Sequence, residues 1–224
     1  EEESTSSVGG SIGYSDFGMN IGLNLSDNNY LGSGNRFIFG INKSIYQESY
    51  NISFFDPYFT MDGVSRGYSI YFRETDYGEY NIANYLTNSQ GLGVQFGYPI
   101  SDTQRIGLNI NFDNTDIDSG SLPSREIADF LSSEGNVFDV LKAQAVWSRV
   151  TLNRGMFPTF GSSTDIMLQA TIPGSDLTYY KTNFRQKFYR PLGFSNLVFG
   201  FDGELGYIGA YGDTEKTPFF ENFY

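Results

Sequence analysis

The sequence contains no cysteine and no histidine among its 224 residues. The first absence excludes disulfides, thiol nucleophiles and thiolate metal sites. The second removes the commonest general base and the commonest metal ligand. Basic residues are also scarce, 14 against 26 acidic ones, which gives a net charge of −12. Because phosphate contacts need clustered lysine and arginine, this balance argues against a nucleic-acid partner.

Long apolar runs are missing as well. No stretch approaches the ~18 residues that suggest a transmembrane helix, and the mean hydropathy is only −0.32. Yet 17% of the residues are aromatic, and the chain holds 21 Phe, 17 Tyr and 26 Gly. This combination is typical of a membrane β-barrel, in which half of each strand faces lipid and half faces a wet lumen.

Apolar and polar residues alternate almost everywhere, which is the pattern of a β-strand. Leu92, Val94 and Phe96, for example, alternate with Gly93 and Gln95. We predict an all-β fold, an antiparallel transmembrane meander of about eleven strands over residues 7–15, 18–26, 35–46, 48–56, 64–75, 89–99, 104–116, 139–153, 163–172, 177–189 and 195–209. Most are long enough to cross a bilayer as tilted strands of ~9–11 residues.

The alternation also predicts which side chains face lipid and which face the lumen. The lipid-facing set includes Leu23, Phe39, Val94, Leu108, Leu168 and Phe199. The lumen-facing set includes Asn24, Asn42, Gln95, Asn109, Gln169 and Asp202. A soluble β-sandwich is the main alternative, but its strands usually have ~5–6 residues. This lumen face is also too polar to form a second packed layer.

The connections predict the topology. Turns 56–63, 99–103 and 154–161 are short and rich in Pro, Gly and Asp, whereas 76–88 and 117–138 are longer and polar. Membrane barrels have short periplasmic turns and longer outer loops, so these two groups should lie at opposite rims. A short amphipathic helix is expected at 123–131. The outer rim should be acidic, because Arg125 is the one basic residue expected there. The acidic residues expected there are Asp76, Glu79, Asp116, Asp118, Glu126, Asp129 and Glu134.

The sequence contains no catalytic constellation, so we expect a protein that is not an enzyme and uses no cofactor. The acid pairs Asp113/Asp116 and Asp202/Glu204 are expected on the lumen face, where paired carboxylates could serve acid–base chemistry. Carboxylates bonded to water or arginine are the simpler interpretation. Calcium bound by Asp116 and Asp118 is a second alternative, and we predict no metal site.

Five segments, taken in order along the chain, resemble barrels of the Omp85 superfamily, and most closely its BamA branch. They are residues 29–34, 50–65, 152–159, 171–176 and 218–224. Within them the family turn motifs fall on Asp56, Pro57, Tyr58, Phe59, Arg154, Gly155, Phe157 and Pro158. The resemblance implies a Gram-negative outer-membrane location and a sixteen-stranded barrel.

The sequence departs from the family pattern in how much of the family's full-length protein it covers. We expect residues 1–224 to be one partial barrel domain, without the periplasmic POTRA domains, the sixth outer loop and the last five strands of the family. An open sheet in lipid would expose unpaired backbone groups at several kcal/mol each. The chain should therefore be a piece of a larger protein.

The resemblance implies mechanical work: folding and inserting client barrels through a lateral gate between the first and last strands. The first strand would pair with an incoming strand, through Ser7, Val8, Gly9, Gly10, Ser11, Ile12, Gly13 and Tyr14. Its glycines weaken the strand, although they could merely ease curvature. The implied partners are unfolded client proteins, periplasmic assembly lipoproteins, lipid and lipopolysaccharide. A passive pore or small-molecule transporter, and a surface adhesion barrel, are the competing functions.

Overall fold

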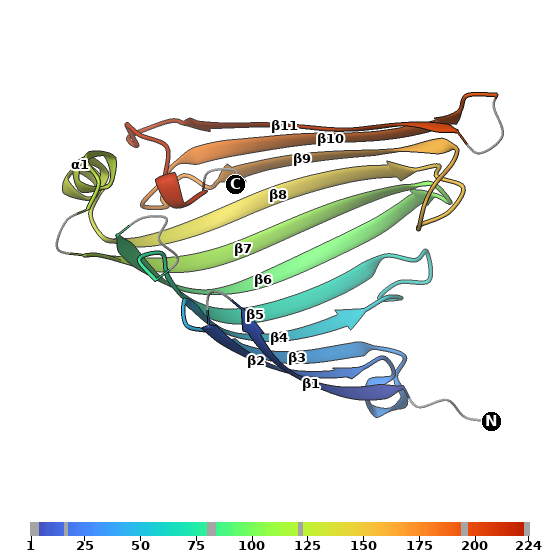
Figure 1. Ribbon diagram of the computed structural model, residues 1–224, viewed down its shortest axis with the longest axis horizontal. Helices are drawn as coiled ribbons and strands as arrows, with labels where there is room; N and C mark the ends of the chain where they lie inside the picture. Colours follow the sequence, from blue (N-terminus) through green and yellow to red (C-terminus); the bar gives the residue numbers. More distant parts are fainter. Residues whose placement is uncertain (1–4, 16–17, 80–83, 121–122, 194–196, 222–224) are drawn as a thin grey trace.

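The computed structural model describes residues 5–15, 18–79, 84–120, 123–193 and 197–221. Eleven antiparallel strands form one sheet in chain order, curved into an open trough (Figure 1). The strands are β1 (Ser6–Ser15), β2 (Gly18–Asp27), β3 (Arg36–Lys43), β4 (Gln47–Asp56), β5 (Ser65–Asp76), β6 (Tyr85–Ser101), β7 (Gln104–Ser119), β8 (Val137–Val150), β9 (Gly161–Thr171), β10 (Tyr179–Pro191) and β11 (Val198–Ala210). The single sheet confirms the predicted meander and excludes a sandwich.

Several element limits differ from those predicted. β6 and β7 continue to Tyr85 and Ser119, into the segments expected to be loops. The helix α1 spans Arg125–Glu134 rather than 123–131, because the Ser124 side chain caps it by accepting a hydrogen bond from the Ile127 N–H at 3.4 Å. The expected start of the last strand, at residue 195, lies outside the described residues. No helix in the described part of the chain is long and apolar enough to cross a membrane.

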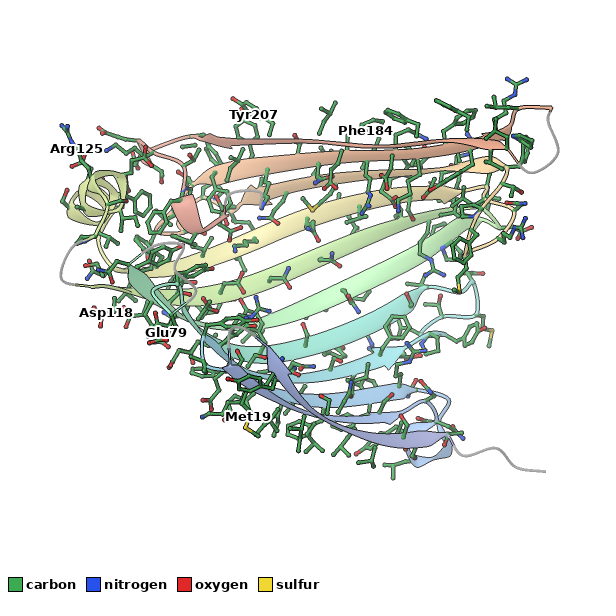
Figure 2. All side chains as sticks on the ribbon, viewed as in Figure 1. Met19, Glu79, Asp118, Arg125, Phe184 and Tyr207 are labelled. Carbon is green, nitrogen blue, oxygen red and sulfur yellow. The ribbon has the colours of Figure 1, made fainter. Side chains whose placement is uncertain are left out.

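The strand order places successive connections at alternate rims of the sheet. The loop rim carries the connections β5–β6, β7–β8 and β9–β10, and Figure 2 shows Glu79, Asp118 and Arg125 there. The turn rim carries the connections β2–β3, β4–β5, β6–β7, β8–β9 and β10–β11. Asp56 ends β4 at the turn rim and Asn84 precedes β6 at the loop rim, so the predicted topology is confirmed.

The strand register sorts the side chains onto two faces. Leu108 lies opposite Phe96 on β6 and Ala145 on β8, and continuing the pairing puts all six predicted lipid-facing residues on one face. This face is convex: Met19, Phe184 and Tyr207 belong to it and point away from the trough (Figure 2). The six predicted lumen-facing residues lie on the concave face, so the facing is confirmed as well.

The concave face is not uniformly polar, in contrast to the prediction. Near the loop rim it carries an apolar cluster of eight buried side chains, Tyr85, Ile117, Ile127, Phe130, Phe138, Val140, Leu177 and Tyr179. Ile127 and Phe130 come from the apolar side of α1, which therefore packs onto the sheet. From β1 to β4, in contrast, Gly40 is the only buried residue among those described.

The facing makes Leu108→Arg a sharp test. Leu108 lies near the middle of the apolar stretch 106–112 of β7 on the convex face, where its side chain is exposed. An arginine near the bilayer midplane on the lipid face should cost about 2–4 kcal/mol of folding free energy. Denaturant unfolding of the full-length protein in lipid vesicles, followed by heat-modifiable gel mobility, would measure this loss.

The neighbouring Asn109 provides the matched control. It lies on the concave face, where its amide donates to the Gln144 side chain at 2.6 Å. Asn109→Arg should therefore cost about 1 kcal/mol, the value of one hydrogen bond. Equal losses for the two arginine variants would contradict the assignment of the faces.

Candidate functional site

The first candidate site is the free edge of β1. This strand pairs with β2 over its whole length, from Ser6–Asp27 to Ser15–Gly18. Within the described part of the chain no strand pairs with its other edge. Residues 6–14 are all exposed, and the side chains of Val8, Ile12 and Tyr14 are 74%, 77% and 88% exposed.

The backbone pattern identifies the groups available for pairing at that edge. The Asn28 N–H donates to the Thr5 carbonyl at 2.9 Å, so Thr5 directs its backbone groups toward the β2 side. In an antiparallel ladder this orientation alternates with every residue. Gly9 and Gly13 therefore face β2 as well, whereas Val8, Gly10, Ile12 and Tyr14 direct N–H and C=O to the free edge.

Among the described residues, none packs closely enough on the β1 glycines to require glycine there. A Cβ added at Gly10 or Gly13 would meet no atom within 4 Å, and one at Gly9 would come only to 3.9 Å from the Asn24 carbonyl. Several glycines elsewhere in the sheet differ. A Cβ on Gly93 would lie 2.2 Å from the Asn111 side chain. The close approach of a neighbouring side chain thus accounts for Gly93 but not for the glycines of the first strand.

The second candidate feature is the β4–β5 turn at residues 57–64. The Asp56 carboxylate accepts from the Tyr58 N–H at 3.1 Å and lies 3.7 Å from the Arg66 guanidinium. The same guanidinium stacks over the Phe59 ring at 3.8 Å. Arg66, which sequence reasoning did not select, therefore joins both ends of the motif. Tyr58 instead points away and is 80% exposed.

The third feature is the β8–β9 connection at residues 151–160. The Asn153 side chain organises it by accepting from the N–H groups of Thr159 and Phe160 at 3.1 and 3.3 Å. Arg154 donates to the Thr159 hydroxyl at 3.4 Å. Phe157 adopts a left-handed φ of 51° with its ring 83% exposed, so the motif presents an aromatic side chain at the turn rim.

The structure does not bring the three predicted features together. The β4–β5 turn lies three strands from β1, and the β8–β9 connection lies farther around the sheet. The two turn motifs shape the turn rim, while the predicted gate residues 7–14 occupy one edge of the sheet. The predicted segment 218–224 is described only to Glu221.

An ionic cluster on the concave face was not predicted at all. The Lys142 ammonium lies 3.0 Å from the Asp113 carboxylate and 2.5 Å from that of Glu221. Tyr71 donates to Asp113 at 2.7 Å, and Lys181 donates to the Glu221 carbonyl at 2.7 Å. The Lys142 side chain is only 14% exposed. The cluster connects β5, β7, β8 and β10 with the C-terminal segment.

That segment, residues 211–221, crosses the concave face as a strap. Phe219 packs edge-on against the rings of Tyr85 and Phe130, at centroid distances of 5.0 and 5.4 Å. Phe220 stacks on Phe138 at 5.9 Å. The strap thus covers the apolar cluster and places Glu221 between two lysines. Its motif was found in the sequence, but the partners of Glu221 lie 40 and 79 residues away.

One of the two predicted acid pairs separates in the structure, whereas Asp202 and Glu204 both lie on the concave face, as predicted. Asp113 lies on the concave face, but Asp116 is three residues farther along β7 and therefore lies on the convex face, so their expected sharing of the lumen face was wrong. Asp202 lies 3.4 Å from both Arg185 and Lys187, and Glu204 accepts from Asn183. Among the described residues no three acidic side chains gather at a metal-binding distance.

The comparisons with known proteins agree with one another. Residues 29–224 match the family model described as the Omp85 superfamily domain. The chain is 30% identical over its full length to the outer membrane protein assembly factor BamA of Neisseria meningitidis serogroup B, and covers 29% of that protein. It is 27% identical to BamA of Buchnera aphidicola over 53% of the chain, which is 19% of that protein.

A solved structure shares the fold. The crystal structure of BamA from Haemophilus ducreyi lacking POTRA domains 1–3 superposes with a TM-score of 0.84 at 24% identity, over the whole chain and 44% of that structure. The chain spans less than a third of the length of the two curated relatives. It belongs to the Omp85 superfamily, and its eleven strands are part of an outer-membrane β-barrel.

Proposed function

We propose that this domain folds and inserts client outer-membrane β-barrel proteins, and that β1 acts as a lateral gate that pairs with an incoming strand. The relatives' name, outer membrane protein assembly factor, supports the assignment of function. The observation that supports the gate is the backbone orientation of β1, which directs the N–H and C=O groups of Val8, Gly10, Ile12 and Tyr14 away from β2. The work is mechanical rather than chemical.

Backbone pairing suits a gate that must accept many client sequences, because main-chain hydrogen bonds do not depend on the side chains of the partner. On the β2 side, no described residue occupies the space beside Gly10 and Gly13, so side chains of β2 do not obstruct a client strand there. In the proposed orientation the turn rim faces the periplasm, where assembly lipoproteins would dock. The acidic loop rim then faces outward, toward lipopolysaccharide.

The decisive variant is Gly10→Pro. Proline lacks an N–H, but the N–H of Gly10 points to the free edge, so the pairing with β2 is kept and an edge strand tolerates the change. One lost hydrogen bond to the client is worth about 0.5–1.5 kcal/mol. Insertion of a client barrel into liposomes by the full-length protein should therefore slow about 2- to 10-fold.

Gly10→Ala is the control, since it keeps the N–H and its Cβ meets no atom within 4 Å. It should insert clients at the rate of the unmodified protein. If folded Gly10→Pro protein did the same, β1 would not pair with clients through this group.

A further inference from the structure

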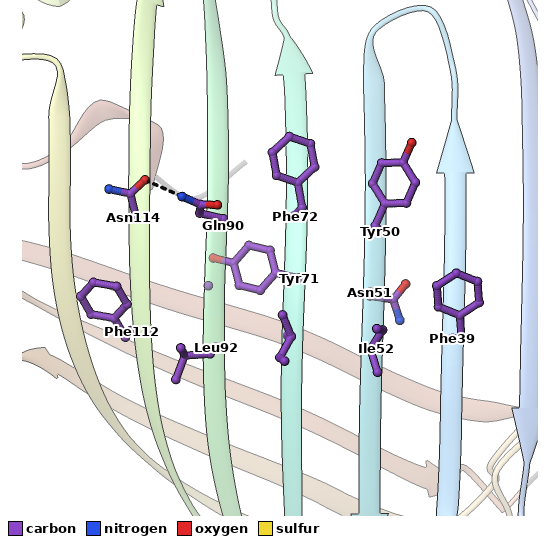
Figure 3. A pocket seen from close by; sticks show the side chains of 12 residues that line it. Phe39, Tyr50, Asn51, Ile52, Tyr71, Phe72, Gln90, Leu92, Phe112 and Asn114 are labelled. Atoms are coloured by element: carbon purple, nitrogen blue, oxygen red, sulfur yellow. Dashed lines mark hydrogen bonds between the residues drawn. The ribbon is translucent and has the colours of Figure 1, made fainter.

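The convex face contains two apolar hollows. The first crosses β3 to β7, where Ile52 and Leu92 lie between the rings of Phe39 and Phe112 (Figure 3). The second, the β8 hollow, crosses β7 to β10, and the convex-face side chains that line it are Leu108, Ile110, Ala143, Ala145, Leu168, Ala170, Tyr180 and Thr182. Their volumes are about 400 and 460 Å³, within the roughly 300–1,000 Å³ typical of small-ligand pockets.

The β8 hollow exists because β8 carries short side chains there. Ala143 and Ala145 are half-buried, and Ala145 lies opposite Leu108 on β7 and Leu168 on β9. These two leucine side chains are 54% and 53% exposed. Low side chains between taller ones form a channel that runs along the strand, and such a channel fits an extended acyl chain.

The β8 hollow lies near the middle of the membrane. On the convex face of β8, Asp139 and Arg149 flank the apolar side chains of 141–147 and are ten residues apart. Ten residues rise about 33 Å along a strand. At the usual tilt this is about 25 Å across the membrane, the height of the apolar band of a membrane barrel. An acyl chain from either side of the membrane can reach the hollow, so the polar ends of β8 decide which side supplies it.

The two ends of β8 differ in charge. At the loop end, the Asp139 carboxylate accepts from Asn114 at 2.7 Å, and the Asp176 carboxylate accepts from the Asp139 N–H at 2.7 Å. At the turn end, Arg149 is exposed and forms no ion pair among the described residues. Gln104 lies opposite it on β7 and adds amide N–H donors. Because a guanidinium can bind two phosphate oxygens at once, the turn end attracts a phosphate, whereas the loop end repels one.

The first hollow lacks such a cation. On the convex face of β5, Arg66 lies four positions from Ile70 toward the turn rim, the same spacing as between Ala145 and Arg149 on β8. The Arg66 guanidinium, however, already lies 3.7 Å from the Asp56 carboxylate and covers a phenyl ring at 3.8 Å. Of the two hollows, only the one over β8 therefore combines an apolar channel with an unpaired guanidinium.

We propose that the β8 hollow holds one acyl chain of an anionic phospholipid whose phosphate binds Arg149. The site goes beyond the proposed function but rests on its orientation, in which the turn rim faces the periplasm. The lipid therefore comes from the periplasmic side, not from the outward lipopolysaccharide. The phosphate accepts from Arg149 and Gln104, and the chain runs past Trp147 into the channel. Because Arg149 repels an ammonium group, a headgroup without one is preferred.

The test uses the full-length protein in nanodiscs of equimolar phosphatidylglycerol and phosphatidylethanolamine. One or the other carries a diazirine near the end of the same acyl chain, and crosslinks are mapped by mass spectrometry. We expect labelling concentrated at residues 143–147, several-fold stronger from phosphatidylglycerol and several-fold weaker in the first hollow. Equal labelling by the two lipids would overturn the proposal. So would displacement of the label by lipopolysaccharide but not by unlabelled phosphatidylglycerol.

Variants separate the headgroup from the chain. Arg149→Gln should abolish the preference for phosphatidylglycerol. Arg190→Gln is the matched control and should keep it, because Arg190 is also exposed near the turn end, on β10, and has no ion pair in the described part of the chain, but does not line the hollow. A preference that survived Arg149→Gln would contradict the site.

Ala145→Phe, or Ala143→Leu if the first fails to fold, fills the hollow and should abolish the concentrated labelling. A filled, folded variant that was still labelled at residues 143–147 would also overturn the proposal. The labelling is measured without a client protein. A protein that is labelled as expected but inserts no client would therefore contradict the proposed function and leave the lipid site intact.

Discussion

Oxidation of a cysteine pair that joins β1 to the last strand of the full-length barrel is expected to stop insertion of client barrels, and reduction to restore it. A gate must separate these two strands before β1 can pair with a client. A disulfide, which holds two Cα atoms within about 4.4–6.8 Å, prevents that separation. The described chain has no cysteine of its own, so within it only the introduced thiol reacts. Insertion is measured as the fraction of client barrel folded into liposomes.

A second disulfide distinguishes a locked seam from a general effect of cross-linking. Ile12 lies opposite Ile21 on β2 at a pair that does not exchange hydrogen bonds, where side chains are closest. The pair Ile12→Cys, Ile21→Cys should oxidise without closing the free edge, and insertion should continue. Undiminished insertion by a seam-locked, folded protein would rule out the gate, since a passive pore needs no seam to open.

Replacing Lys142 by methionine should destabilise the barrel by about 3–5 kcal/mol, because removal of one partner from a buried ion pair leaves an uncompensated charge. Here two carboxylates, Asp113 and Glu221, lose the same ammonium group. Their mutual repulsion should also release the strap. Denaturant unfolding of the full-length protein in vesicles measures the stability, and protease cleavage within residues 211–221 measures the release.

Lys187→Met is the matched control. Lys187 also pairs with a carboxylate on the concave face, that of Asp202, at 3.4 Å. Both side chains are far more exposed than those of the cluster, and in the variant Asp202 would still pair with Arg185. Such an exposed pair contributes about 0–1 kcal/mol. Adding Glu221→Gln to Lys142→Met should recover part of the loss. If Lys142→Met and Lys187→Met lowered the free energy of unfolding by similar amounts, the buried ionic cluster would stabilise the barrel no more than the exposed pair does.

Much of the sheet could be predicted because its information is local. Leu108 and Asn109 are neighbours with opposite environments, and that contrast recurs along nearly every strand, so both the faces and the meander followed from the pattern. The strand ends were less accurate. Thr87 and Ile117 occupy segments that were expected to be loops. They pair with each other across β6 and β7, and their side chains are buried on the concave face, so the two strands continue there.

The ionic cluster could not be predicted because its parts are remote in sequence. Lys142 alternates like any lumen-facing residue, and nothing nearby indicates that Asp113 and Glu221 will reach it. The error at Asp116 had a different cause. It was paired with Asp113 by proximity, although three positions on a strand reverse the facing. The different surroundings of Gly10 and Gly93 likewise cannot be seen in the sequence, since only the structure shows that the Asn111 side chain approaches Gly93.

The strands of the sheet differ in how much buried packing they carry on the concave face, and this difference has a mechanical consequence. The ionic cluster, α1 and the strap tie β5 to β10 together on one side of the trough, whereas β1 to β4 carry no buried side chain among the described residues. A bending force on such a wall is not shared evenly. The braced strands are stiff, and the deformation concentrates in the compliant ones that end at β1. In the proposed gate, the elastic work of moving this edge therefore falls mainly on these four strands of the described sheet.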